Sequence, residues 1–415
     1  MSGQGALVLA VVCATVLLMA GCAVGLVGLP PMVMYPCITP DPNNESVENQ
    51  TFSFSYAGRI ETLTVEIPLS VYSGAKRADK NATLIGRVPR REWLAGYYRS
   101  FMEDPAQDAF MGMLIDQLRA IRTARGLSDD EYVEMIVCFV QTIPYRTPTE
   151  PGPPKYPVEI LAEGAGDCDD KSLLLVALLS REGYNCSLMY FEPETHMAVG
   201  IAGDEAAGYR GTGYLFIEST RISLVGAASE YLSGGVEVAS EPLVIQMGNG
   251  RRLFHSWSDV AAILDALGTA DRRKRILAAE KAEAGTAMAR LAGSGRLREY
   301  SLRAAEYSRI SAEYDETSAV ADRIRHHLDD RTGLTRWLAG QRAAGSGTSL
   351  EGGSNGFVPI GSDHQMGDEV EYPPEEDELT VRDDVADHVR EDRRIEGADI
   401  SLGIDDAADH QAELR

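Results

Sequence analysis

The chain is short of basic residues. Its 415 residues include 39 lysines and arginines against 63 aspartates and glutamates, giving a formal net charge of −24 and a sequence pI of about 4.7. Proteins that bind nucleic acid present a basic footprint, so this deficit argues against a nucleic-acid partner. The acidic balance favours a soluble, self-repelling surface. Hydrophobic residues make up 44 %, which can supply a substantial core.

Charged residues are absent from residues 6–40. Within this stretch, residues 6–29 are long enough to cross a bilayer as a helix, and a Pro-Pro pair follows them. We therefore expect residues 1–35 to be a transmembrane anchor or a signal segment. A retained anchor is favoured because no lysine or arginine precedes the apolar run. Cleavage as a signal peptide and lipidation at Cys22 are the alternatives.

A second membrane-spanning run is absent from the sequence, so everything after residue 40 is expected on one side of the membrane. Four Asn-x-Ser/Thr triplets follow the apolar segment, at Asn44, Asn49, Asn81 and Asn185. The first two lie just beyond the segment and favour an outside location. The sequence thus predicts a single-pass membrane protein whose main domain is extracytoplasmic.

Cysteines are few in this chain, and Cys138 and Cys186, which could pair with each other, are expected to be buried thiols because they stand in apolar contexts. Only Cys138, Cys168 and Cys186 lie in the expected folded region, and an odd number leaves at least one thiol free. No histidine and cysteine cluster has zinc-ligand spacing. His196 is the only histidine before residue 255, so it is the one imidazole available to a thiol in that half of the chain.

The residue pattern predicts an α+β domain over residues 52–250, preceded by a polar stalk over 36–51. Residues 62–71 alternate like a half-buried strand, and Pro68 makes it an edge strand. Helical spacing runs through 93–102 and 106–125, and Ser128 with Glu131 forms a capping box that opens a helix to about Gln141. A central apolar helix over 168–181 and three strands over 186–191, 196–202 and 214–220 follow.

After residue 250 the composition changes. Alanine, arginine and glutamate dominate an α-helical region over 251–343, in which residues 293–295 break two long helices. These helices are expected to form a hairpin or an oligomerising arm. Residues 344–415 are Gly/Ser-rich and then strongly acidic, with almost no aromatic residues, so we expect a disordered tail.

Cys168 stands at the start of the predicted apolar helix, where a helix N-terminus lowers a thiol pKa. His196 starts the next strand but one and is the candidate general base and acid. Glu218 lies in an otherwise apolar strand, so it is the best candidate to orient the imidazole. Together the three residues predict a cysteine-nucleophile enzyme.

An acyl-transfer site also needs hydrogen-bond donors for the oxyanion. The backbone N–H of Cys168 is one candidate. Gln141 or Tyr145 is the candidate for the second donor. The alternatives are that Gln141 caps its helix and that Tyr145 packs beneath the active-site loop.

Several motifs together resemble those of transglutaminase-like domains, in the papain-like clan of cysteine enzymes. The resemblance extends over residues 60–235, is closest to the archaeal membrane-anchored group, and rests on these segments: Phe139-Val140-Gln141, Pro144-Tyr145, Tyr156-Pro157, Gly166-Asp167-Cys168-Asp169-Asp170-Lys171-Ser172, His196-Met197-Ala198-Val199-Gly200 and Tyr214 through Glu218 to Thr220. It implies a papain-like fold with the cysteine helix packed on an antiparallel sheet.

The resemblance also implies a catalytic triad in the order Cys168, His196, Glu218. Many members have aspartate at the third position, so Glu218 is a departure that leaves room for a longer or water-mediated contact. Transamidation, peptide hydrolysis and deamidation all occur in the family through a thioester, so the fold does not choose the reaction.

Three aspartates flank the nucleophile. Asp167, Asp169 and Asp170 suit the first turn of a helix, and they also raise the pKa of the neighbouring thiol. A bacterial branch of the clan binds calcium beside a similar box. By that resemblance the three carboxylates are candidate calcium ligands, although no cofactor is required for the chemistry.

Two functional hypotheses follow. The first is a membrane-anchored extracytoplasmic hydrolase or acyltransferase that acts on peptide or isopeptide bonds of proteins or peptides near the membrane. The second is a catalytically inactive module of the same fold that binds peptides or assembles complexes through its C-terminal helices. The complete Cys, His and acid set favours the first.

Overall fold

A computed structural model describes residues 31–147, 152–203, 208–228 and 237–345. The predicted membrane segment at residues 6–29 and the acidic tail beyond residue 345 lie outside the described residues. Among the described residues, no helix combines the length and apolar character needed to cross a membrane. The described chain up to residue 338 belongs to one compact unit, and residues 339–345 belong to a second.

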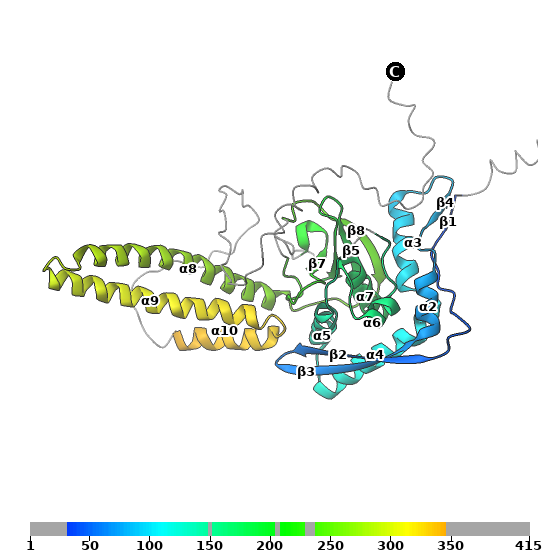
Figure 1. The fold of residues 1–415 in the computed structure, drawn as a ribbon, viewed down its shortest axis with the longest axis horizontal. Helices are drawn as coiled ribbons and strands as arrows, with labels where there is room; N and C mark the ends of the chain where they lie inside the picture. Colours follow the sequence, from blue (N-terminus) through cyan, green and yellow to red (C-terminus); the bar gives the residue numbers. More distant parts are fainter. Residues whose placement is uncertain (1–30, 148–151, 204–207, 229–236, 346–415) are drawn as a thin grey trace, which may run out of the picture. The chain divides into compact units, whose positions relative to one another are not determined.

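The chain is a mixed α+β protein, as the sequence predicts (Figure 1). Its strands are β1 Met32–Met34, β2 Val47–Tyr56, β3 Arg59–Pro68, β4 Thr83–Ile85, β5 Asn185–Phe191, β6 His196–Ala202, β7 Tyr214–Ile217 and β8 Leu243–Asn249. Its helices are α2 Leu69–Arg77, α3 Arg90–Met102, α4 Asp108–Arg125, α5 Asp129–Thr142, α6 Pro157–Glu163, α7 Cys168–Arg181, α8 Trp257–Leu291, α9 Leu297–His326 and α10 Arg331–Gly345.

Every described strand pair is antiparallel. The largest sheet has the order β7-β6-β5-β8, and β1 with β4 and β2 with β3 form two separate two-stranded sheets. In β6 all seven residues are buried, because the strand is flanked by β5 and β7 and covered by α7. The strand that begins with His196 therefore lies inside the domain.

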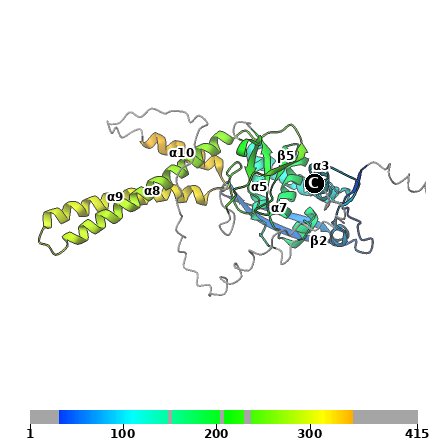
Figure 2. The ribbon, with the colours of Figure 1, turned by 90° about the horizontal axis from the view of Figure 1, so that it is seen from above.

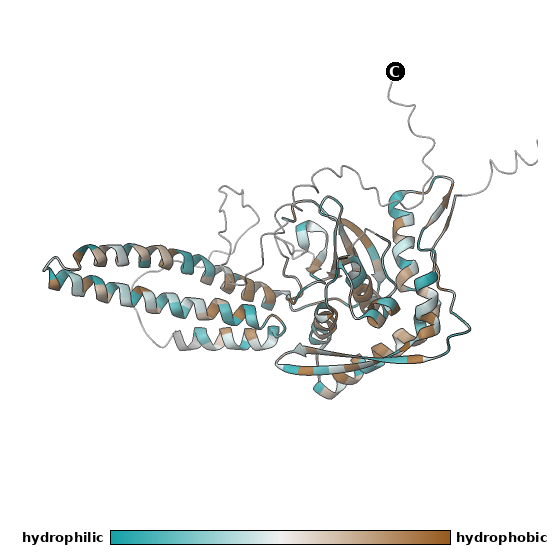
Figure 3. Cartoon of the chain, viewed as in Figure 1, coloured by the Kyte–Doolittle hydropathy of each residue, from teal (hydrophilic) through white to brown (hydrophobic). Residues whose placement is uncertain are grey.

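Helix α7 is the centre of the core. Its residues 170–179 are all buried, and the run 173–179 is apolar on every side (Figure 3). A helix without a polar face must be enclosed by other elements. Strands β5, β6 and β8 pack against it, and so do α3, α5 and α6. This packing fixes the place at which the first turn of α7, with Cys168, emerges.

Helix α5 begins at the predicted capping box. The Ser128 hydroxyl accepts the Glu131 N–H at 3.3 Å, and the Glu131 carboxylate accepts the Ser128 N–H at 2.9 Å. Residues 132–141 are then all buried. The C-terminal end of α5 consequently reaches the interior beside α7, where Gln141 makes the contacts described below.

The predicted stalk over residues 36–51 is wrong. Ile38 is buried, and its N–H donates to Asp104 Oδ2 at 2.7 Å. Residues from Val47 onward form β2, which pairs along its whole length with β3. The sequence misled because β2 has mostly polar residues facing solvent, and only its end carries buried Phe54 and Tyr56. The predicted strand at 62–71 forms, but it ends at residue 68 and α2 follows.

The predicted helical region forms three helices. Helices α8 and α9 run side by side as a hairpin, with the turn at residues 292–296 close to the predicted break (Figure 2). Leu277, Ala284 and Ile310 form a small apolar cluster between them. The ends of the hairpin differ, because Val260 and Ile324 belong to the main core. Helix α10 was not separated from α9 in the sequence pattern.

A buried ion pair ties the C-terminal helices to the α5 helix. Arg331, only 6 % exposed, donates from Nε to Glu134 Oε1 at 2.5 Å and from Nη1 to Asp259 Oδ2 at 2.6 Å. Tyr56 of β2 also donates to Glu134, at 3.3 Å. Removing one partner from such a pair leaves a buried charge, which is more costly than the pair itself.

We expect Arg331→Met to lower the free energy of unfolding by about 3 kcal/mol or more, because Glu134 then stays buried without its cation. Urea unfolding monitored by circular dichroism measures the change. Arg303→Met is the control, since Arg303 and Glu306 form an exposed pair that contributes under about 1 kcal/mol. A double variant, Glu134→Leu with Arg331→Met, should recover most of the loss. Equal losses of stability in Arg331→Met and Arg303→Met would contradict a stabilising buried pair between Arg331 and Glu134.

Candidate active site

The first turn of α7 is closed by a capping box of its own. Asp167 is the N-cap residue, and its carboxylate accepts the Asp170 N–H at 3.2 Å. Asp170 in turn accepts the Asp167 N–H at 3.3 Å. Cys168 is therefore the first helical residue, where its backbone N–H is one of the four that lack a partner within the helix. The position agrees with the predicted nucleophile at a helix N-terminus.

Gly166 allows the close approach at this entry. A Cβ added at Gly166 would lie 2.8 Å from the Cβ of Asp170, so a larger residue would push the box apart. The same segment lies beside the chain that follows α5. Tyr145 and Gly166 form an isolated parallel bridge, and the Arg146 N–H donates to the Gly166 carbonyl at 3.0 Å. Tyr145 is thus held next to the cysteine turn.

The thiol lies against the start of β6. Cys168 Sγ is 4.0 Å from the Thr195 carbonyl, and the Met197 N–H donates to the sulfur. Thr195 has φ +48°, a left-handed conformation that turns the chain into the strand. Cys168 therefore lies against the backbone on either side of His196 in the sequence, and the pairing of its thiol with the imidazole stays a prediction. Among the described residues, no hydrogen bond joins the sulfur to the imidazole.

Glu218 follows β7 directly and faces the imidazole. His196 Nε2 lies 3.8 Å from Glu218 Oε2, and the two side chains are 8 % and 2 % exposed. This distance is too long for a hydrogen bond, so the contact is one of charge, and Nε2 has no hydrogen-bond partner among the described residues. The longer contact that glutamate leaves room for, expected from the sequence, is observed.

The Glu218 carboxylate is strongly stabilised in its charged form. Burial by itself would raise its pKa, but the His196 side chain and two donors from Thr220 outweigh burial and bring the pKa to about 2. The Thr220 N–H and hydroxyl donate to Oε1 at 2.9 and 2.7 Å. Oε1 is thus occupied by Thr220, and Oε2 is left to face the imidazole.

The thiol pKa moves in the opposite direction to the one expected from the helix N-terminus. Burial first, and then the charge of Asp169, raise the pKa of Cys168 to about 12, although the N–H groups of Met197 and Asp169 oppose the rise. The helix N-terminus lowers the thiol pKa, whereas burial and the neighbouring aspartates raise it, and in this structure the effects that raise it are larger. The resting sulfur is a thiol at neutral pH.

Gln141 does not face the site as an oxyanion donor. Its Nε2 donates to the carbonyls of Glu218 at 2.7 Å and Ser223 at 3.2 Å, and its Oε1 accepts the Ser223 N–H at 3.2 Å. Both amide hydrogens are engaged, so the prediction of a free donor at Gln141 is wrong. Tyr145 stays a candidate because its side chain is 46 % exposed and Cys168 is among the charges that influence it.

Two further tyrosines near the thiol were missed by the sequence reasoning. Burial raises the pKa of Tyr98 and of Tyr190, and Asp169 and Cys168 contribute to both shifts. Their phenols therefore stay protonated as donors at neutral pH. Tyr98 comes from α3 and Tyr190 from β5, so only the tertiary fold places them beside Cys168.

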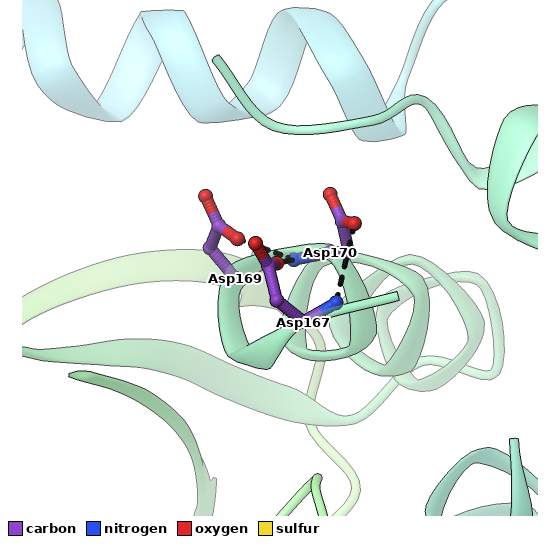
Figure 4. Close-up of side chains that lie close together, drawn as sticks. All are labelled: Asp167, Asp169 and Asp170. Atoms are coloured by element: carbon purple, nitrogen blue, oxygen red, sulfur yellow. Dashed lines mark hydrogen bonds between the residues drawn. The ribbon is translucent and has the colours of Figure 1, made fainter. Parts of the chain in front are cut away.

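The three aspartates of the predicted calcium site do converge (Figure 4). Ligand atoms of Asp167, Asp169 and Asp170 all lie within 4.8 Å of one another. Asp170 is already engaged, since its carboxylate accepts the Lys155 N–H at 2.7 Å and lies 3.4 Å from the Lys155 ammonium. Three carboxylates are fewer than the six to eight oxygens that calcium takes. Calcium binding stays a prediction.

Comparisons with protein-family models, with curated proteins and with solved structures give no match. The class of this site therefore rests on its own geometry and on the sequence motifs.

We expect Cys168 to be alkylated slowly by iodoacetamide at pH 7.5, because its pKa is raised, and faster in Asp169→Asn. Each unit by which the pKa falls gives about a tenfold increase in thiolate. Peptide mass spectrometry of the full chain measures the rate, with exposed Cys37 as the internal reference.

Asp116→Asn, a change at an exposed acid on α4, is the control for this experiment and should leave the rate unchanged. Added calcium should accelerate the labelling of the wild type, and not of Asp169→Asn, if the carboxylates bind it. Labelling of Cys168 as fast as that of Cys37 at pH 7.5 would contradict the raised pKa.

Because the pKa of Glu218 is lowered in the folded protein, the free energy of unfolding should fall as the pH is lowered. A carboxyl whose pKa is about 2 when folded and 4.5 when unfolded stabilises the protein above about pH 4.5, and this contribution is lost as pH falls toward 2. Its full size is about 3 kcal/mol. Urea unfolding between pH 2.5 and 6 should show a shallower pH slope in Glu218→Gln. Glu66→Gln, at an exposed position on β3, should keep the wild-type slope.

Proposed function

We propose that this chain is a transglutaminase-like cysteine enzyme that transfers or hydrolyses the acyl group of peptide or isopeptide amides through a thioester on Cys168. The observation that carries the proposal is the convergence of three elements. The N-terminus of α7 brings Cys168, the start of β6 brings His196, and the end of β7 brings Glu218. A nucleophile, a base and an orienting acid are the parts such chemistry needs.

The packing of the cysteine helix supports a papain-like core. Helix α7 lies against the antiparallel β7-β6-β5-β8 sheet, with the thiol at the helix end nearest the first residue of β6. This is the arrangement that the motif resemblance implies. The predicted anchor at residues 6–29 would hold such an enzyme at the outer face of a membrane, where envelope proteins or peptides are within reach.

The raised thiol pKa shapes the proposed reaction. His196 removes the proton as the sulfur attacks the amide carbonyl carbon, so the thiolate forms only with the new C–S bond. The imidazolium then gives that proton to the leaving nitrogen as the C–N bond breaks, and an acyl thioester remains. Water or an amine then attacks the thioester carbonyl and loses a proton to His196. The C–S bond breaks, and the imidazolium returns its proton to the sulfur, which regenerates the thiol. Glu218 stays ionised and stabilises the imidazolium between these transfers.

A catalytically inactive binding module is the alternative, and two observations favour it. The pKa of Cys168 is raised to about 12, and no hydrogen bond joins its sulfur to His196 among the residues described. A site of this kind could bind a peptide without reacting with it. The two functions differ in whether an acyl group is ever transferred to Cys168 with the help of His196.

p-Nitrophenyl acetate separates the two functions, because an activated ester acylates a nucleophile without the correct natural substrate. For the enzyme we expect acetyl mass on the Cys168 peptide of the full chain, formed at least tenfold more slowly in His196→Gln. Cys37 is the internal control, since acetylation of this exposed thiol should not depend on His196. Added cadaverine, trapped as its acetyl amide, would distinguish transfer from hydrolysis.

Acetylation of Cys168 that is insensitive to His196→Gln would sink the enzyme proposal. The binding module would then be the better description. Cys168→Ala should retain the fold and lose only the acylated peptide, which shows that the readout reports this thiol.

A further inference from the structure

Lys171 is the one lysine of the cysteine helix, and its side chain is completely buried. Its ammonium donates to three backbone carbonyls, those of Gln141 at 3.0 Å, Ile143 at 2.6 Å and Thr220 at 3.4 Å. An ammonium has three donor hydrogens, so all of them are used. The carbonyls of Gln141 and Ile143 lie at the C-terminal end of α5, and Thr220 comes two residues after Glu218.

A charged side chain is unusual at a fully buried position of this helix. The seven residues that follow Ser172 on the same helix are buried and apolar, whereas Lys171 carries a charge into the same interior. A buried cation is costly unless it is paired, and among the described residues Lys171 forms no ion pair with a carboxylate within 4 Å. Burial lowers the pKa of Lys171 to about 8, and Glu218 partly offsets that effect. The ammonium is therefore held in the interior by its three carbonyl hydrogen bonds and not by an ion pair.

The last turn of α5 is linked by hydrogen bonds to the segment that carries Glu218. Ile143 is the C-cap of α5, so its carbonyl and that of Gln141 belong to the helix end that needs donors from elsewhere. Lys171 satisfies these two carbonyls and reaches Thr220 with the same group. From the same turn, the Gln141 side chain holds the Glu218 and Ser223 carbonyls.

We propose that Lys171 is a positioning residue, which ties the segment carrying Glu218 to the end of α5 and so holds the carboxylate against His196. This inference rests on the proposed function for its catalytic meaning. Lys171 touches no reacting atom, because its ammonium is buried and donates to three backbone carbonyls. It acts through Glu218 and, through Glu218, on the imidazole.

The test is the titration of His196 followed by NMR in histidine-labelled full-length protein, with the signal assigned by His196→Gln. In Lys171→Met the freed segment should carry Glu218 away from the ring, so the pH midpoint of His196 should fall, as it should in Glu218→Gln. Loss of a nearby cation alone would raise the midpoint. The direction of the shift therefore separates positioning from a simple charge effect.

Leu178→Ala is the matched control, because it removes a fully buried side chain from the same helix away from the site. It should leave the His196 midpoint in place. If Lys171→Met does not fold, Lys171→Gln, which keeps amide donors on a shorter neutral side chain, is measured in the same way. An unchanged or raised midpoint in the folded variant overturns the proposal.

Kinetics on the activated ester gives the second readout. If Cys168 is acylated as proposed, Lys171→Met should lower the acylation rate about a hundredfold, the loss expected from a misplacement of about 1 Å, and leave substrate affinity unchanged. If wild-type Cys168 is not acylated while the His196 midpoint still falls in Lys171→Met, the enzyme proposal fails and the positioning role stands. The two failures are thus distinguishable.

Discussion

The packing of α7 is the constraint on which the rest of the domain depends. A helix that is apolar on every side is stable only when it is surrounded, so the β7-β6-β5-β8 sheet and helices α3, α5 and α6 close around it. Its N-terminal turn is then delivered to the start of β6. The thiol lies against the Thr195 carbonyl there, and Glu218, which follows β7, faces the imidazole of His196.

The same burial acts differently on the acid and on the thiol. Glu218 keeps its charge because the His196 side chain and two donors from Thr220 outweigh burial and lower its pKa. Cys168 keeps its proton because burial, first, and then the neighbouring Asp169 raise the pKa of its thiol. A low-dielectric interior strengthens whichever partner is present, so the identity of the neighbour decides the outcome.

The C-terminal helices are linked to this core through α5. Arg331 binds Glu134 in the middle of that helix, and Gln141 and the carbonyls bound by Lys171 lie at its end. Helix α5 is therefore a shared support for the helical region and for the segment that carries Glu218. The α8–α9 hairpin beyond the core has its own small apolar cluster, so its middle does not depend on the domain for burial.

Local patterns in the sequence determined a large part of this structure. Helical spacing and the Ser128 cap predicted α5, the apolar run at 173–179 predicted α7, and the apolar runs around His196 predicted β5, β6 and β7. Cys168, His196 and Glu218 could be chosen because each is unusual where it stands. Strand β2, read as a stalk, was missed because a strand with one solvent-facing side and few apolar residues has a weak local signal.

Tertiary structure alone decided the contacts between elements that are distant in sequence. The Gln141 side chain donates to the Glu218 carbonyl, and the buried Lys171 ammonium donates to three carbonyls. The sequence pattern does not predict these bonds, because their partners lie about 30 to 80 residues away in the chain. The thiol pKa was decided in the same way, since desolvation depends on everything packed around the sulfur. A sequence determines its residues' local preferences and chemistry, whereas the strength of each charge and hydrogen bond is set by the neighbours that folding supplies.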